Sequence, residues 1–131
     1  MRRCLYCYQP LEEEKFEFHS ACSRKIFGTP NPPELPYSEE QMLQLAEKVV
    51  KSQTTVTGVQ PKLSLHLEKL KKKDEPQRFT IVGLWGGYIL KPPTEQYQSL
   101  PELEDLTMHL AEISGIEVVP HSLLRLSSGK L

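Results

Sequence analysis

The hydrophobic and polar positions change their period along the chain. Polar and apolar residues alternate over 62–68, which predicts a strand with one buried face. That face would carry Leu63, Leu65 and Leu67. Apolar residues at helical spacing predict instead a helix over 39 to about 52, and Ser38 with Gln41 forms a capping box at its start.

The second half of the chain continues this mixture. Apolar runs over 79–84 and 88–91 predict two more strands that extend the first into an antiparallel meander. A helix is predicted over 103–114, before Gly115, with its apolar stripe facing the sheet. That stripe would consist of Leu103, Leu106, Leu110 and Ile113. The apolar segments 116–119 and 121–126, separated by Pro120, predict one or two further strands.

Composition divides the chain into three parts. Residues 1–28 hold every cysteine and are called the knot below. Residues 29–37 contain four prolines and predict an extended linker, and residues 38–131 carry the helix and strand patterns. We therefore expect an α+β fold, an antiparallel sheet with two helices, preceded by a small Cys/His segment.

Charge and hydropathy exclude several classes of protein. The chain has 16 Lys plus Arg against 17 Asp plus Glu, so it lacks the cationic balance of a protein that mainly binds nucleic-acid phosphates. No run of eighteen apolar residues and no apolar signal-peptide core is present. We expect a soluble, cytoplasmic protein with no membrane or direct nucleic-acid partner.

The knot contains four residues with metal-ligand spacing. They are Cys4-x-x-Cys7 and His19-x-x-Cys22. Three thiolates and one imidazole make a closed tetrahedral site, which suits structural zinc and stabilises a segment too small to fold alone. The alternative is three free cysteines and a surface histidine. Nucleic-acid binding by the knot is disfavoured, because Lys15 is the only Lys or Arg between Cys4 and Cys22, among four glutamates.

Two further groups suggest phosphate chemistry. The loop 52–62 has four hydroxyl residues around Gly58 and could present backbone donors to a phosphate, although it matches no standard phosphate-loop pattern and is otherwise a Thr-rich connection. Lys91 ends the third predicted strand, and Glu104 begins the following helix. A strand lysine held by a helix glutamate is the arrangement with which protein kinases bind nucleotide phosphates.

Other titratable residues receive no function from the sequence. We expect three acidic residues near Glu104 to be solvated, namely Glu102, Asp105 and Glu112. No role is assigned to His66, His109 or His121.

From about residue 52 to 126 the chain resembles the HipA-like Ser/Thr kinases, especially the shorter HipT-type toxin kinases of toxin-antitoxin systems. The resemblance is carried by the segments 55–63, 88–92 and 103–120, in that order. It implies that the nucleotide-binding residues are Thr57, Gly58, Val59, Gln60, Lys62 and Lys91. Lys91 and Glu104 would be catalytic, with Glu104 orienting Lys91, and ATP with Mg would be the cofactor of the complete kinase.

The same resemblance implies that Thr55 and Thr57 are autophosphorylation sites, although the family carries serines there. A second departure is that the chain's two aspartates, Asp74 and Asp105, stand in no catalytic-loop context. We therefore expect an N-terminal lobe that is inactive without a C-terminal lobe.

Partners follow from the resemblance alone: the C-terminal lobe, an antitoxin protein and an aminoacyl-tRNA synthetase substrate. The alternative function is a non-catalytic protein-binding or regulatory module of a toxin-antitoxin system.

Overall fold

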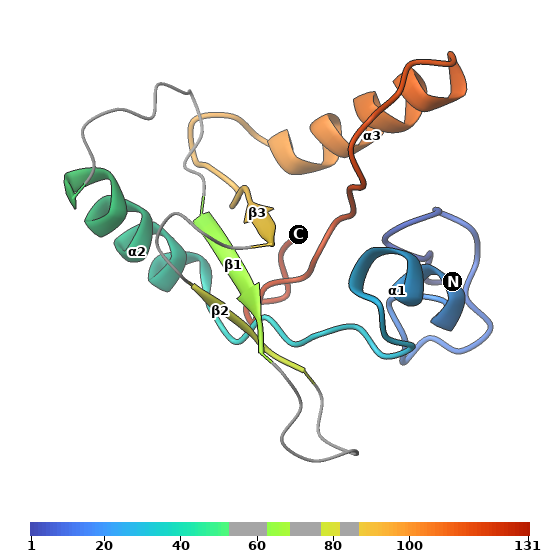
Figure 1. Cartoon of the computed structure of the whole chain (residues 1–131), viewed down its shortest axis with the longest axis horizontal. Helices are drawn as coiled ribbons and strands as arrows, with labels where there is room; N and C mark the ends of the chain where they lie inside the picture. The colour runs from blue at the N-terminus through green and yellow to red at the C-terminus, as the bar shows by residue number, and fades with distance from the viewer. Residues whose placement is uncertain (53–62, 69–76, 82–86) are drawn as a thin grey trace.

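The computed structural model describes residues 1–52, 63–68, 77–81 and 87–131. Within these residues the fold is α+β, with helix α1 (Ser20–Phe27) in the knot, helix α2 (Glu39–Ser52) after the linker and helix α3 (Leu100–Ile113) near the end (Figure 1). Two helices were expected, and α1 is an additional one. No described helix is long and apolar enough to span a bilayer.

In the described part of the chain the sheet has three antiparallel strands, in the order β2-β1-β3. Strand β1 (Leu63–Leu67) lies in the centre, between β2 (Phe79–Ile81) and β3 (Tyr88–Leu90). The predicted meander is therefore wrong, because a meander would put β2 in the centre. Alternation of polar and apolar residues fixes which face of a strand is buried, but it does not fix which strand lies beside it.

Helix α2 begins with the predicted capping box. The backbone N–H of Ser38 donates to Gln41 Oε1 over 2.9 Å, and the backbone N–H of Gln41 lies 3.3 Å from Ser38 Oγ. Each side chain thus satisfies a donor at the helix start that has no partner within the helix. Met42, in the first turn, is fully buried.

Helix α3 starts three residues earlier than predicted, with Pro101 in its first turn. Its apolar stripe does not face the sheet, which corrects the prediction. The exposed fractions are 55% for Leu103, 45% for Leu106, 56% for Leu110 and 83% for Ile113. The buried residue of α3 is Asp105, at 5% exposure, so the expectation of a solvated Asp105 is also wrong. Polar contacts described below, rather than apolar burial, attach this helix to the rest of the chain.

Residues 116–126 form no strand, although one or two were predicted. The segment runs back from α3 past α1 (Figure 1). It contacts the knot, where the backbone N–H of Leu123 donates to the carbonyl of Leu5 over 3.3 Å. Leu126 is buried in the core. Burial against the knot and the core accounts for the apolar residues of 121–126, whereas Ile116 and Val119 are 61% and 70% exposed.

The buried apolar side chains of the described residues form one cluster that includes knot, linker and sheet residues. Phe27 of α1 lies with its ring centroid 5.9 Å from that of Phe79 in β2 and 6.3 Å from that of Tyr88 in β3. The Tyr88 hydroxyl also donates to the carbonyl of Ile26. The linker contributes Leu35, and its Glu34 forms an isolated parallel bridge with Arg78. The division into knot, linker and lobe stays a prediction.

Candidate functional site: a Cys/His metal centre and a lysine–glutamate pair

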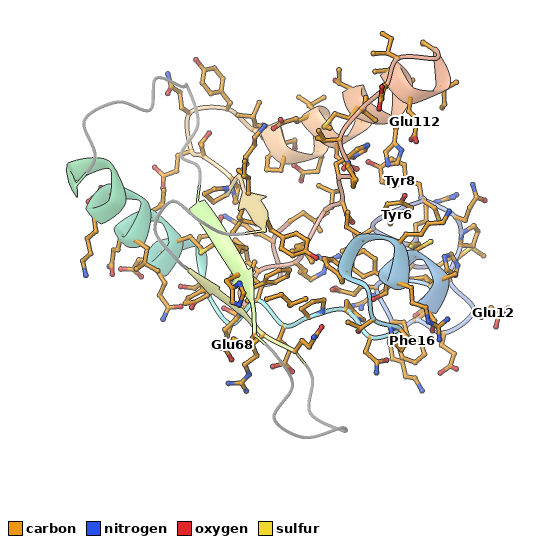
Figure 2. The ribbon with its side chains drawn as sticks, viewed as in Figure 1. Tyr6, Tyr8, Glu12, Phe16, Glu68 and Glu112 are labelled. Carbon is orange, nitrogen blue, oxygen red and sulfur yellow. The ribbon has the colours of Figure 1, made fainter. Side chains whose placement is uncertain are left out.

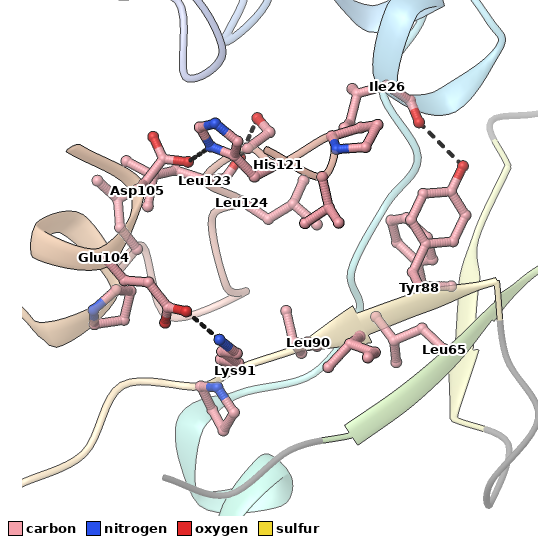
Figure 3. A pocket seen from close by; sticks show the side chains of 18 of the residues that line it. Ile26, Leu65, Tyr88, Leu90, Lys91, Glu104, Asp105, His121, Leu123 and Leu124 are labelled. Carbon is pink, nitrogen blue, oxygen red and sulfur yellow. Dashed lines mark hydrogen bonds and ion pairs between the residues drawn. The ribbon is translucent and has the colours of Figure 1, made fainter. Parts of the chain in front are cut away.

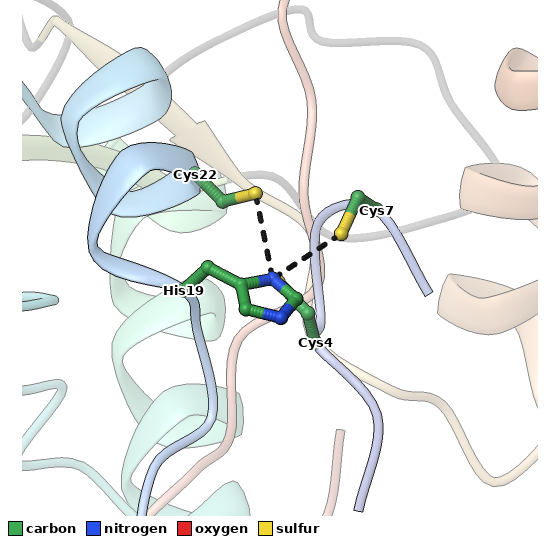
Figure 4. A group of neighbouring side chains, drawn as sticks. All are labelled: Cys4, Cys7, His19 and Cys22. Atoms are coloured by element: carbon green, nitrogen blue, oxygen red, sulfur yellow. Dashed lines mark hydrogen bonds between the residues drawn. The ribbon is translucent and has the colours of Figure 1, made fainter. Parts of the chain in front are cut away.

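The knot brings its four predicted metal ligands together (Figure 4). One ligand atom from each residue lies within 4.8 Å of the others. Nδ1 of His19 is 3.5 Å from Cys7 Sγ and 3.8 Å from Cys22 Sγ. Zinc bonds of about 2.3 Å to sulfur and about 2.0 Å to nitrogen, at the tetrahedral angle, put these atoms about 3.5 Å apart. The donor set and its dimensions therefore fit zinc.

Short-range hydrogen bonds fold each half of this centre. Two backbone hydrogen bonds close the Cys4-x-x-Cys7 turn. The N–H of Tyr8 donates to the carbonyl of Cys4 over 3.0 Å, and the N–H of Cys4 donates to the carbonyl of Gln9 over 2.9 Å. His19 is the N-cap of α1, and Cys22 lies in its first turn. Residues three apart on a helix face the same side, so His19 and Cys22 approach one ion together.

His19 is oriented by its second ring nitrogen. Its Nε2–H donates to the carbonyl of Pro10 over 3.0 Å. The other nitrogen, Nδ1, then carries the lone pair and faces the two sulfur atoms. A hydrogen bond of this kind is the usual device that fixes the tautomer of a metal-binding histidine.

The thiols of the centre differ in their acidity. Burial raises the pKa of Cys4, but hydrogen bonds from the backbone of Cys7, His19 and Tyr6 outweigh it and bring this pKa down to about 7. Burial, together with hydrogen bonds and charge from Cys7 and Cys4, raises the pKa of Cys22 to about 12. The negative charge of one thiolate thus disfavours ionisation of the next thiol. A bound divalent cation would offset this charge repulsion. All three cysteines are free of disulfides.

The structure also brings together Lys91 and Glu104. Nζ of Lys91, just after β3, forms an ion pair with Oε1 of Glu104 in the first turns of α3 (Figure 3). The two side chains are 36% and 33% exposed, so the pair is reachable from solvent but shielded on one side. It borders a cavity of about 720 Å³, whose walls include Leu65, Tyr88 and Leu124. A part-buried ammonium held in one position can bind an anion with little loss of entropy.

The strand register relates Lys91 to the predicted phosphate loop. Leu63, the first residue of β1, pairs with Leu90, the residue before Lys91. The loop residues Thr55, Thr57, Gly58, Val59, Gln60 and Lys62 themselves lie outside the described residues. In the sequence, Lys62 comes directly before Leu63, the residue that pairs with Leu90.

Sequence reasoning missed a polar cluster around Asp105. The Tyr8 hydroxyl donates to Oδ2 of Asp105, and Nδ1 of His121 lies 2.6 Å from Oδ1. The ring of His109 packs edge-on against those of Tyr8 and His121, with centroids 4.7 and 4.6 Å away. Burial, and then Asp105, raise the pKa of the Tyr8 phenol, which therefore stays a hydrogen-bond donor. The four-residue spacing of Asp105 and His109 was the available signal, since it places both on one face of α3.

Part of the chain is similar to a protein that is named as a kinase. No protein-family model matches the sequence. One similar protein, named "Putative kinase", comes from Haemophilus influenzae (strain ATCC 51907 / DSM 11121 / KW20 / Rd) and is 38% identical over 93 residues. These residues are 70% of this chain but 24% of the relative, so the chain spans about a quarter of that protein's length. The similarity supports a kinase-like family and no finer assignment.

Proposed function

We propose that this chain is the ATP-binding N-terminal lobe of a HipA-like Ser/Thr protein kinase. The observation that carries the proposal is the Lys91–Glu104 ion pair between the end of β3 and the start of α3. Similarity to a protein named as a kinase supports the same chemistry.

In this proposal Lys91 binds the ATP phosphates, and Glu104 holds the ammonium in place. The loop residues 57–60 and Lys62 cover the phosphates, because β1, which follows the loop, begins opposite the residue before Lys91. Thr55 and Thr57 in this loop would accept the phosphate in autophosphorylation. Magnesium would screen the phosphate charges, and its ligands would come from a second lobe. The chain alone would therefore position ATP without transferring phosphate.

The knot would hold a structural zinc ion through Cys4, Cys7, His19 and Cys22. Four protein ligands leave no open coordination position, so the ion would stabilise the fold and take no part in the reaction.

The test is phosphorylation of the loop in a protein that joins this chain to a catalytic lobe. Lys91→Ala should abolish phosphate on Thr55 and Thr57, as mapped by mass spectrometry of the purified protein. Lys130→Ala is the matched control, because Lys130 pairs with Glu39 and not with Glu104. Phosphate that persists in Lys91→Ala at the control level would refute the role of Lys91.

A second function, a non-catalytic protein-binding module, is favoured by one observation. The exposed apolar side chains of α3 form a stripe of the kind found at protein interfaces. This function predicts that the Lys91→Ala protein, which carries no loop phosphate, keeps its affinity for the partner. Leu110→Asp should remove that affinity. Loss of ATP binding in Lys91→Ala, with no effect of Leu110→Asp on partner binding, would favour the kinase.

A further inference from the structure

The polar cluster around Asp105 connects three segments that are distant in sequence. Asp105, 5% exposed, accepts from Tyr8 of the knot through one carboxylate oxygen and from His121 of the C-terminal segment through the other. Figure 2 shows Tyr8 on the side of the knot that faces α3, whereas Phe16 lies on the far side. One buried carboxylate therefore attaches α3 to both neighbours.

Asp105, His109 and His121 lie close enough together to hold a metal ion, but in the structure Asp105 and His121 are joined directly by a hydrogen bond. Asp105 Oδ1 and His121 Nδ1 are 2.6 Å apart, which is a hydrogen-bond length. Two ligands bonded at about 2.0 Å to one tetrahedral ion would be about 3.3 Å apart. Each oxygen of the carboxylate has a hydrogen-bond partner, whereas the buried Nε2 of His109, 3.5 Å from Oδ2, has none among the described residues.

Tyr8 is held by hydrogen bonds of the turn that carries Cys4 and Cys7. Tyr8 follows the ligand Cys7 directly, and its backbone has a left-handed φ of 61°. A non-glycine residue keeps this conformation when its surroundings hold it there. Here the surroundings are the turn closed on the Cys4 carbonyl, and a second bond from Arg3 Nη1 to the Tyr8 carbonyl over 2.9 Å. Zinc at Cys4 and Cys7 would fix both ends of that turn.

The other end of the tie reaches the lysine–glutamate pair. Asp105 is the next residue after Glu104 on the same helix, so a shift of Asp105 moves Glu104 with it. The apolar stripe of α3, which could have packed against the rest of the chain, is exposed. Polar contacts therefore hold the helix in place. The sequence of contacts is metal centre, Tyr8, Asp105, Glu104 and Lys91.

We propose that the knot positions Glu104 against Lys91 through the hydrogen bond of Tyr8 to Asp105, so that the lysine–glutamate pair is complete only in the metal-bound protein. Tyr8 and Asp105 are then positioning residues. The meaning of this coupling for ATP rests on the proposed kinase function. It would make ATP binding dependent on zinc occupancy.

The test measures the pair itself and requires no nucleotide. The zinc-loaded chain is treated with an amine-reactive reagent, and the labelling rate of Lys91 is followed by mass spectrometry, with Lys130 as the internal reference. Tyr8→Phe removes only the hydroxyl. Tyr6→Phe is the matched control, since no side-chain hydrogen bond of Tyr6 occurs in the described part of the chain.

Tyr8→Phe should keep its zinc and label Lys91 roughly two- to fivefold faster, the range for loss of a part-exposed ion pair. Removal of zinc from the unchanged chain should do the same, and Tyr6→Phe should not. Should Tyr8→Phe lose zinc, Asp105→Asn, which lies outside the knot, replaces it with the same expectation.

Equal Lys91 labelling in the unchanged chain and in the zinc-loaded variant would overturn the coupling. Faster labelling together with absent ATP binding in the two-lobed protein would uphold the coupling and refute the kinase function instead.

Discussion

Cys22 and Cys4 lie in one centre, yet their thiols have very different acidity. Cys4 can lose its proton near pH 7, whereas the pKa of Cys22 is about 12. The metal-free centre at neutral pH therefore keeps a proton on Cys22. Because a metal ion binds the thiolate, zinc must displace that proton whenever it enters.

Zinc affinity should consequently rise with pH. Above about pH 7 the Cys22 proton is released on binding, which gives a gain in affinity of at least about tenfold per pH unit. Below about pH 7 the Cys4 proton is displaced as well, and the dependence becomes steeper by about a further tenfold per unit. Competition with a chelating indicator, from about pH 6 to about pH 8, measures this. An affinity that is constant over that range would contradict the assignment of thiolate ligands.

Replacement of a single ligand should empty the centre. Cys7→Ser keeps the approximate size of the side chain but removes the sulfur atom that lies 3.5 Å from His19 Nδ1. We expect the purified variant to contain no stoichiometric zinc and to be less stable than the unchanged protein. Ser20→Ala, an exposed position in the same segment, is the control. Unchanged metal content in Cys7→Ser would refute the zinc site.

At the scale of elements, local chemistry decides how much the sequence can predict. The capping box of α2 and the metal-ligand pairs involve residues at most a few positions apart, and the structure has them as predicted. The strand order and the buried face of α3 depend on distant segments. Asp105 is buried because Tyr8 and His121 meet it, and no periodicity within α3 contains that information.

The capping box also gives a test of helix energetics. Ser38→Ala should destabilise the protein by about 1 kcal/mol, since it leaves the N–H of Gln41 without its side-chain partner. Urea unfolding followed by circular dichroism measures the change. Ser127→Ala, an exposed serine outside the helices, should change stability by less than about 0.5 kcal/mol. Equal effects of the two substitutions would show that the cap contributes nothing.

The whole molecule has a continuous apolar core from the knot to the sheet. Phe27 is 6% exposed and contacts aromatic rings on both sides, with Phe18 at 5.4 Å and Phe79 at 5.9 Å between centroids. A core shared in this way predicts that knot and sheet unfold together and not as separate units.

Phe27→Ala should therefore cost about 3–5 kcal/mol and destabilise both parts. Hydrogen exchange monitors the knot and the sheet separately in the same sample. Phe16→Ala is the control, because Phe16 is 46% exposed. Protection lost in the knot while that of β1 stays unchanged would show that the two parts have independent cores.

The connection between the knot and residues 121–125 also constrains how the protein is made. All four metal ligands lie within residues 4–22, so zinc can bind as soon as this short segment leaves the ribosome. The partners of the knot come much later, since Leu5 contacts Leu123 and Glu17 forms an ion pair with Arg125, 108 positions away. During synthesis the loaded knot must therefore wait for about 100 further residues before the segment that contains Arg125 can cover this side of it. Early zinc capture would hold Leu5 and Phe27 in place over that interval, when an unloaded segment would be open to aggregation and proteolysis.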